Sequence, residues 1–340
     1  AIVLLCVGGV ITSVFINKKS ENIPISFNEI KEPLIEGKYS TFLNENKNLI
    51  HNSNYSKTYE ANEFTNVEKY NNHDNVNTCY IKENDSISLN VNVENAGLYQ
   101  INLSYYLLTD EYGSNEISIY VNDKIQYDEA RQISLKEKWF DNQEITIDRY
   151  GNDNLPEQIK YNGLLSYTLK DSSSLYDEGL YFKLNSGNNK IDIKSVQGDL
   201  DLLSLSLIQN NEEKSYEDYY HNEKINNIST LTYEAEKYES KNSSDIQIGT
   251  SNDCNVTPYA LNRNKLNIIG SDNFNEAGDK VDYIVNVKEA GYYYLTFKVL
   301  QQEKNTTSYR SIYINDEIPF KEARNIPFSY SSNWQNVTAG

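Results

Sequence analysis

The chain has 340 residues, of which 38% are hydrophobic, and this is enough apolar material for the cores of two ordinary domains. Its 31 basic and 49 acidic residues give a net charge of −18, which repels nucleic acid and anionic membrane surfaces and argues against nucleic acid as a partner. An acidic surface suits hard cations and neutral ligands instead. The 29 tyrosines offer rings that contact sugars or proteins, although tyrosine is equally a good strand former.

The first residues are apolar, and the stretch ends at Asn17-Lys18-Lys19. Residues 1–17 are too short for a full bilayer crossing, so we interpret them as the remnant of a signal sequence or membrane anchor, with a buried helix as the alternative. Residues 18–54 are polar and rich in asparagine, which predicts a stalk.

Beyond the stalk the sequence alternates between apolar and polar residues, as half-buried strands do. The pattern covers residues 88–93, 117–121, 283–287 and 293–299. Asn122-Asp123 follows the second of these and tolerates turn conformations, so residues 117–127 are predicted to form a hairpin. Residues 209–229 lose the alternation and form a linker, in which Tyr216 to Tyr219 suit a short helix.

The same landmarks occur twice in the same order. Asn122-Asp123 returns as Asn315-Asp316 and Trp139 returns as Trp334, and other pairs are Tyr59 with Tyr233, Gly97 with Gly291 and Glu129-Ala130-Arg131 with Glu322-Ala323-Arg324. Self-similarity over so long a period predicts two copies of one domain. The fold class is therefore all-β, with two tandem antiparallel jelly-roll sandwiches: a module at 55–210, a linker at 211–230, and a module at 231–340 that lacks counterparts of the first module's closing strands.

Two openings carry a family resemblance: Tyr59-Glu60-Ala61-Asn62 and Tyr233-Glu234-Ala235-Glu236, each followed later in its copy by an Ala-Gly turn with a nearby tyrosine. They resemble non-catalytic carbohydrate-binding modules with a galactose-binding-like jelly roll. The order of the landmarks is similar to that in the N-terminal region of large solute-binding proteins of bacterial ABC sugar importers. These landmarks run from Glu129-Ala130-Arg131 through residues 147–156, 262–270 and 319–320 to Trp334. The resemblance covers residues 55–340, and the chain departs from it at Asn62, where a second glutamate is expected.

The resemblance implies a non-catalytic, extracellular carbohydrate-binding region of a solute-binding protein that is anchored to the bacterial cell membrane and works with an ABC transporter permease. Two alternatives stay open: the accessory binding region of a glycoside hydrolase or lyase, and an adhesin or structural spacer. The three histidines lie far apart in polar stretches and predict no general base or zinc site. Among the 49 acidic residues the sequence neither nominates nor excludes the carboxylate pair of a glycosidase. From the resemblance we expect no enzyme.

Candidate sugar-binding residues are aromatic, because exposed rings stack on the apolar face of a sugar. The tryptophans stand at equivalent places in both copies, which also fits a role in the core. Tyrosines that occur in one copy only are suited to a variable ligand surface. The candidates are Trp139, Tyr161, Tyr176, Tyr181 and Trp334.

Acidic residues of the opening and closing strands predict a structural calcium site. Glu60 and Asp201 are its expected ligands in the first copy and Glu234 and Glu236 in the second, with solvent-facing acids as the alternative. The stretch around Asp148-Arg149 is either a carboxylate–arginine site or a turn braced by a local salt bridge, and Gly151-Asn152-Asp153 favours the turn.

Overall fold

The computed structural model describes residues 6–7, 10–11, 37–49, 55–73, 75–108, 113–209, 213–220 and 230–339. Contacts divide the chain into two compact units. The larger unit comprises residues 27–212 and 225–291, and the smaller one comprises residues 1–26, 213–224 and 292–340.

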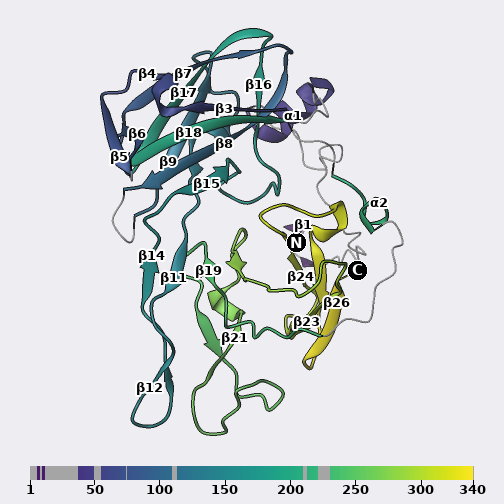
Figure 1. Ribbon diagram of the computed structural model, residues 1–340. Coiled ribbons are helices and arrows are strands. Elements are labelled where there is room, and N and C mark those ends of the chain that lie inside the picture. Colours follow the sequence, from purple (N-terminus) through teal and green to yellow (C-terminus); the bar gives the residue numbers. More distant parts are fainter. Residues whose placement is uncertain are drawn as a thin grey trace. The chain divides into compact units, whose positions relative to one another are not determined.

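The larger unit is built on a β-sandwich of two antiparallel sheets (Figure 1). The first sheet has seven strands in the order β15-β8-β18-β6-β5, with β16 also paired to β8 and β3 also paired to β18. Its strands are β3 (Tyr55–Glu60), β5 (Lys69–His73), β6 (Val76–Ile81), β8 (Gly97–Leu107), β15 (Leu165–Thr168), β16 (Tyr181–Leu184) and β18 (Leu200–Gln209).

The second sheet has five strands in the order β10-β9-β17-β7-β4. Its strands are β4 (Phe64–Thr65), β7 (Ser86–Val93), β9 (Glu116–Val121), β10 (Ile133–Ser134) and β17 (Gly187–Gln197). Leu89, Val91 and Val93 on β7 are buried while Asn90 and Asn92 are exposed. The inner faces of both sheets share one hydrophobic core, so the prediction of an all-β sandwich is confirmed.

A tight turn follows β9 as the sequence predicts. Asn122 and Asp123 both have positive φ, 51° and 62°, and Val121 forms a bridge with Lys124 on the other side of the turn. Two successive residues with positive φ define the turn type that matches the twist of a hairpin, and asparagine and aspartate tolerate it best after glycine. The 3₁₀ helix η3 (Asp128–Arg131) comes soon afterwards.

Part of the predicted stalk belongs to the sandwich. Helix α1 (Tyr39–Asn46) and the 3₁₀ helix η1 (Lys47–Leu49) pack against it, and Tyr39 and Leu43 are buried in its core. The stalk prediction is therefore wrong for residues 37–49, because two apolar side chains one helical turn apart are enough to dock a short helix.

The predicted anchor lies almost wholly outside the described residues. Within them, β1 (Cys6–Val7) pairs with β2 (Val10–Ile11). No helix in the described ranges has the length and apolar character needed to cross a bilayer.

A long hairpin leaves the sandwich between β10 and β15, and we call residues 137–161 the arm (Figure 1). It contains β11 (Trp139–Asp141), β12 (Thr146–Ile147), β13 (Asp153–Asn154) and β14 (Gln158–Lys160). Strand β11 pairs with β14 on one side and with β19 (Ser240–Lys241) on the other, and β19 pairs with β22 (Val281–Asp282). A further hairpin joins β20 (Ile248–Thr250) to β21 (Leu266–Ile269).

This four-stranded sheet joins the two sequence repeats. Lys241 is fully buried, and its Nζ lies 3.2 Å from Asp141 Oδ1 in the arm and also donates to the Ile246 carbonyl oxygen. Tyr238 donates its hydroxyl to Asp141 Oδ2 at 2.9 Å. Residues 230–282 of the second repeat thus fold onto the arm of the first, and the compact units do not follow the sequence division at 211–230. The tandem-domain boundaries themselves stay a prediction.

The smaller unit repeats local features of the first sandwich. Asn315 and Asp316 have φ of 52° and 64°, like their counterparts Asn122 and Asp123, and Ile314 forms the equivalent bridge with Glu317. Besides β1 and β2, its described elements are α2 (Tyr216–Tyr220), β23 (Leu295–Val299), β24 (Thr307–Arg310), the 3₁₀ helix η5 (Lys321–Ala323), β25 (Ile326–Ser329) and β26 (Gln335–Ala339). Helix α2 confirms the predicted short helix.

One pair of strands has the same register in both copies, β10 with β9 in the first and β25 with β24 in the second. Ile133 pairs with Ile117 in the first copy, and Ile326 pairs with Arg310 in the second, at the same places relative to the Asn-Asp turn. The strand predicted at 283–287 is wrong, since only residues 281–282 are extended into a ladder there. In the first copy the matching strand β7 is held by β17, whereas residues 283–287 lie in no ladder.

We expect the contact between Lys241 and the arm to stabilise the larger unit. Replacing Lys241 by alanine leaves the Asp141 carboxylate without its buried cation and should lower the free energy of unfolding by about 3 kcal/mol. Lys280→Ala is the matched control, because Lys280 pairs with Asp282 at a part-exposed site and its loss should cost less than about 1 kcal/mol. Urea unfolding measures both, and equal costs would contradict a role for this contact.

Candidate functional site

The outer face of the seven-stranded sheet carries a cluster of polar and aromatic side chains. Asp201 on β18 lies opposite Tyr106 on β8 and Tyr80 on β6, so these three side chains project from the same face. Asn71 and His73 on β5 join them at the edge of the sheet. We call these five residues the sheet-face cluster.

Asp201 is the buried centre of this cluster. Its side chain is 0% exposed, although it lies on the outer face, because the neighbouring side chains cover it. Asn71 Nδ2 lies 2.9 and 3.0 Å from its two carboxylate oxygens, and His73 Nε2 lies 2.6 Å from Oδ2. A buried carboxylate is stable only when such donors replace water, so Asp201 fixes the positions of Asn71 and His73.

The rings of the cluster are ordered as well. His73 stacks on Tyr106 with ring centroids 4.0 Å apart and an angle of 6° between the planes, and both side chains stay part-exposed. The Tyr80 hydroxyl donates to Asp199 Oδ2 at 2.6 Å, and this hydrogen bond is the main cause that raises the pKa of Tyr80 to about 12. The cluster therefore presents aromatic rings, an amide and a hydroxyl in fixed positions.

Polar residues continue from the cluster across the same sheet. Ser166 donates to Asn102 Oδ1 at 3.0 Å, and Asn102 Nδ2 donates to Thr168 Oγ1 at 3.2 Å. The hydroxyls of Thr58 and Ser206 lie 2.7 Å apart. The outer face thus combines side-chain hydroxyls and amides with rings at one end.

The structure separates the predicted sugar-binding residues. Trp139 is 3% exposed and donates Nε1 to Glu137, and Tyr176 is 8% exposed in the core, so neither offers a free ring face to a sugar. Both are held in packed contacts, Trp139 between neighbouring strands and Tyr176 edge-on against Tyr39. For Trp139 the alternative of a core role agrees with this placement.

The other three candidates also lie apart. Tyr161 is 37% exposed at the end of the arm's β14, where it packs edge-on against Phe140. Tyr181 is part-buried at the start of β16, and its backbone N–H donates to the Tyr39 hydroxyl. Trp334 is part-exposed in the smaller unit. No described contact brings these rings into one surface.

The structure gives the predicted calcium ligands different surroundings. Glu60 is exposed and lies opposite Ser204 in the ladder, while both oxygens of Asp201 accept hydrogen bonds from Asn71 and His73. Glu234 is exposed, whereas burial raises the pKa of Glu236. Within the described ranges no three His, Cys, Asp or Glu residues form a group that suits a metal ion, and calcium stays a prediction.

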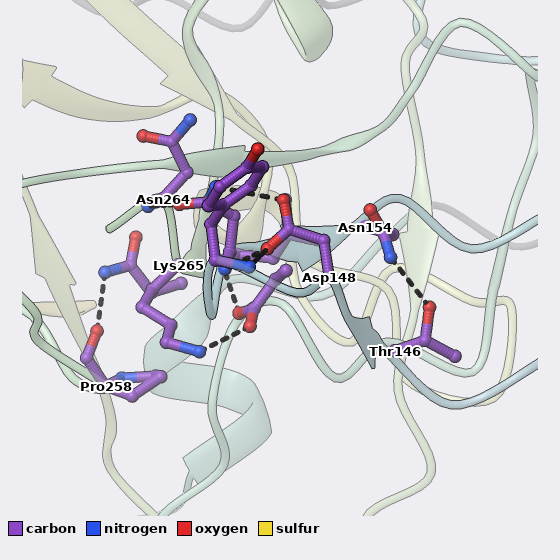
Figure 2. A network of polar contacts seen from close by, with 11 residues as sticks. Thr146, Asp148, Asn154, Pro258, Asn264 and Lys265 are labelled. Carbon is purple, nitrogen blue, oxygen red and sulfur yellow. Dashed lines mark hydrogen bonds and ion pairs between the residues drawn. The ribbon is translucent and has the colours of Figure 1, made fainter. Parts of the chain in front are cut away.

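The tip of the arm forms a second polar network, which Figure 2 shows. Asp148 Oδ1 accepts the backbone N–H groups of Tyr150 and Asn152 at 2.8 and 2.9 Å, and Oδ2 accepts the Asn152 amide at 3.1 Å. These donors, led by Asn152, lower the pKa of Asp148. The predicted turn is present, but backbone N–H groups brace it rather than a salt bridge with Arg149.

Sequence reasoning missed Asn71, His73, Tyr80 and Tyr106. Asn71 and His73 are two residues apart, as are Thr78 and Tyr80, so each pair lies on one face of its strand. This spacing is the sequence signal for a shared polar face. Nothing in the sequence pairs these strands with Asp201, which lies 128 positions from His73. From the sequence alone His73 is therefore an isolated histidine in a polar stretch.

No protein-family model matches the sequence, and no curated protein matches it. Among solved structures it is similar to a family 35 carbohydrate-binding module from Clostridium thermocellum, at 14% identity and a TM-score of 0.27 over 45% of this chain and 98% of that one. It is also similar to the C-terminal family 6 module of a marine laminarinase from Zobellia galactanivorans, at 8% identity and a TM-score of 0.28 over 45% and 99%.

The exo-β-1,3-galactanase of Phanerochaete chrysosporium matches at 12% identity and a TM-score of 0.27, over 45% of this chain and 29% of the enzyme. The chain therefore spans less than a third of that enzyme's length. TM-scores and identities this low decide nothing about function.

We expect Asp201 to hold the sheet-face cluster together. Asp201→Ala leaves the Asn71 amide and the His73 ring without their acceptor and should cost about 1–3 kcal/mol of folding free energy. Ser206→Ala, further along β18 on the same face, is the control and should cost less than about 1 kcal/mol, since it removes one part-exposed hydroxyl contact. Thermal and urea unfolding test this, and an unchanged stability in Asp201→Ala would contradict it.

The cysteines should differ in reactivity. Cys79 is buried with its Sγ donating to the Ala61 carbonyl oxygen, and burial raises its pKa to about 12, while Cys254 is exposed. Because the thiolate is the reactive form, iodoacetamide at pH 8 should modify Cys254 and leave Cys79 unmodified until the protein is unfolded. Mass spectrometry of the peptides decides this, and rapid labelling of Cys79 in the folded protein would refute it.

Proposed function

We propose that the first sandwich binds carbohydrate, without chemistry, on the outer face of its seven-stranded sheet. The observation that carries the proposal is the sheet-face cluster, in which the buried Asp201 orders Asn71, His73 and Tyr106 at a part-exposed surface. The family resemblance seen in the sequence supports the same function.

The chemistry of this face matches that of a sugar. A pyranose presents hydroxyl groups at its rim and C–H groups on its faces, and side-chain amides and hydroxyls pair with the first while aromatic rings pack on the second. Asn102, Ser104 and Ser166 extend the polar surface away from the rings. Fixed side chains lose little rotamer entropy on binding, which favours binding even when the ligand contact is shallow.

The cluster is suited to binding rather than to bond cleavage. Hydrolysis of a glycosidic bond needs two carboxyl groups that reach the substrate. Asp201 is fully covered, and its two oxygens accept hydrogen bonds from its own neighbours. In the proposed role it positions the rings and the amide and does not touch the sugar.

Two settings fit such a binding region. An open sheet face suits a long glycan chain, and this favours an accessory region that holds a glycan-degrading enzyme on its polymer. The resemblance to solute-binding proteins of sugar importers supports the other setting, in which the protein is anchored outside a bacterial cell and delivers sugar to a permease. An adhesin or spacer would need the sheet face to bind protein or nothing.

Tyr106 provides the test of the proposed site. Tyr106→Ala should weaken glycan binding by about 10-fold, because it removes a ring worth roughly 1 kcal/mol or more in stacking and loosens His73. Tyr106→Phe keeps the ring and should bind within about threefold of the native chain. Tyr120→Ala, on β9 of the other sheet, is the matched control and should bind normally.

A glycan array selects the ligand, and isothermal titration with the native chain and these variants measures its affinity. Melting temperatures show that each variant is folded. Binding that survives Tyr106→Ala, or that falls equally in Tyr120→Ala, would move the site away from this face, and turnover of any glycan would overturn the non-catalytic assignment.

A further inference from the structure

The tip of the arm presents an exposed tyrosine against an arginine. Tyr150 is 65% exposed, and Cζ of Arg149 lies 4.6 Å from the centroid of its ring. The Arg149 guanidinium also donates to the Tyr150 hydroxyl. A cation above a tyrosine ring is attracted to its π face, so Arg149 and Tyr150 hold each other in place and leave most of the ring in solvent.

A second arginine lies across the same turn. Gly151 has φ of +85°, and a Cβ atom there would come within 3.0 Å of Cζ and Nε of Arg263. The absence of a side chain at this position therefore allows both the left-handed turn and the approach of Arg263. We call residues 148–152 together with residues 263–265 the arm tip.

Contacts between two distant segments fix this arrangement. The backbone N–H of Asn264 donates to Asn152 Oδ1 at 3.0 Å, and the backbone N–H of Asp153 donates to the Asn264 carbonyl oxygen at 2.9 Å. Asp153 also forms an ion pair with Lys265 at 2.5 Å and accepts the backbone N–H of Leu266. Figure 2 shows Asp148, Asn264 and Lys265 gathered at this junction.

Some charges at the arm tip are paired within the tip, whereas the two arginines form no ion pair with a described residue. Lys265 and Asp153 neutralise each other, and Asp148 accepts hydrogen bonds from the turn's own N–H groups. Both Arg149 and Arg263 are exposed, and neither has an ion pair with a residue in the described ranges. A chain of net charge −18 thus carries two guanidiniums without an ion pair at one turn, Arg149 against the Tyr150 ring and Arg263 against Gly151.

We propose that the arm tip is a second binding site, separate from the sheet-face cluster, and that it takes an anionic saccharide. The guanidiniums of Arg149 and Arg263 bind a carboxylate or sulfate group, and the exposed part of the Tyr150 ring packs on the sugar that bears it. Arginine matches both anions because its planar N–H groups donate in pairs. This proposal rests on the proposed function in one respect, that the ligand is a carbohydrate.

The test uses the intact chain and three polymers: polygalacturonate, which bears carboxylates, a sulfated galactan, and a neutral galactan. The double variant Arg149→Gln, Arg263→Gln should lose at least about 10-fold in affinity for the anionic polymer that the native chain binds, since each charge-assisted hydrogen bond contributes roughly 1.5 kcal/mol or more. Tyr150→Ala should lose about 5-fold or more, in line with one lost stacking contact.

Two further variants separate specific recognition from charge alone. Arg149→Lys, Arg263→Lys keeps both charges but loses the paired N–H geometry, and it should recover only part of the affinity. Arg131→Gln removes an exposed arginine that pairs with Asp128 away from the arm, and it should bind normally. Melting temperatures check that each variant is folded.

Every outcome bears on the proposal. Arginine-dependent binding of polygalacturonate identifies the anion as a carboxylate, and arginine-dependent binding of the sulfated galactan identifies it as a sulfate ester. Failure of the native chain to bind either polymer, or equal binding by the double glutamine variant, would overturn the site. Tyr106→Ala should leave this binding intact. The experiment can therefore contradict the arm-tip site without contradicting the sheet-face site, and the reverse.

Discussion

Strand β18 is the constraint on which the rest of the larger unit depends. It pairs with β8 along one edge and with β6 and then β3 along the other. Its ladder with β8 has a register shift between Leu202 and Ser204, where the other edge passes from β6 to β3. Its inward leucines enter the shared core, and its outward Asp201 orders the sheet-face cluster. Side chains alternate between the two faces of a strand, so the register that places the leucines in the core also places Asp201 on the outer face.

The arm attaches the start of the second repeat to the first. It carries a short strand, β11, that is paired on both sides, and the buried Lys241 and the Asp153–Lys265 ion pair attach the start of the second repeat to it. A buried ion pair of this kind adds little compared with a well-packed apolar pair, but removal of one partner leaves the other charge uncompensated. The contact therefore penalises any other arrangement of the charged groups. The arm tip and the sheet-face cluster are thereby parts of one compact unit. The two proposed sugar contacts would reinforce each other on a long glycan that reaches both.

Much of the fold was readable from the sequence, since it depends on local rules. Alternation predicted β7, β9 and β23, the Asn122-Asp123 turn follows from backbone tolerance, and helix α2 fell within the predicted linker. The repeat predicted that Asn315-Asp316 would form the same turn as Asn122-Asp123. Local rules failed at residues 283–287, where an apolar period had no partner strand, and at residues 37–49, where two buried side chains docked an otherwise polar segment.

The sequence by itself determined the all-β class, the turns and the doubling of landmarks, because strand period and turn chemistry act over a few neighbouring residues. Only the tertiary structure decided which residues meet. It buried Trp139 and Tyr176 and brought His73 and Tyr106 together around Asp201. Arg263 likewise reached Gly151 of the arm. These contacts depend on strand pairings between residues far apart in the chain, and a single sequence does not specify such pairings.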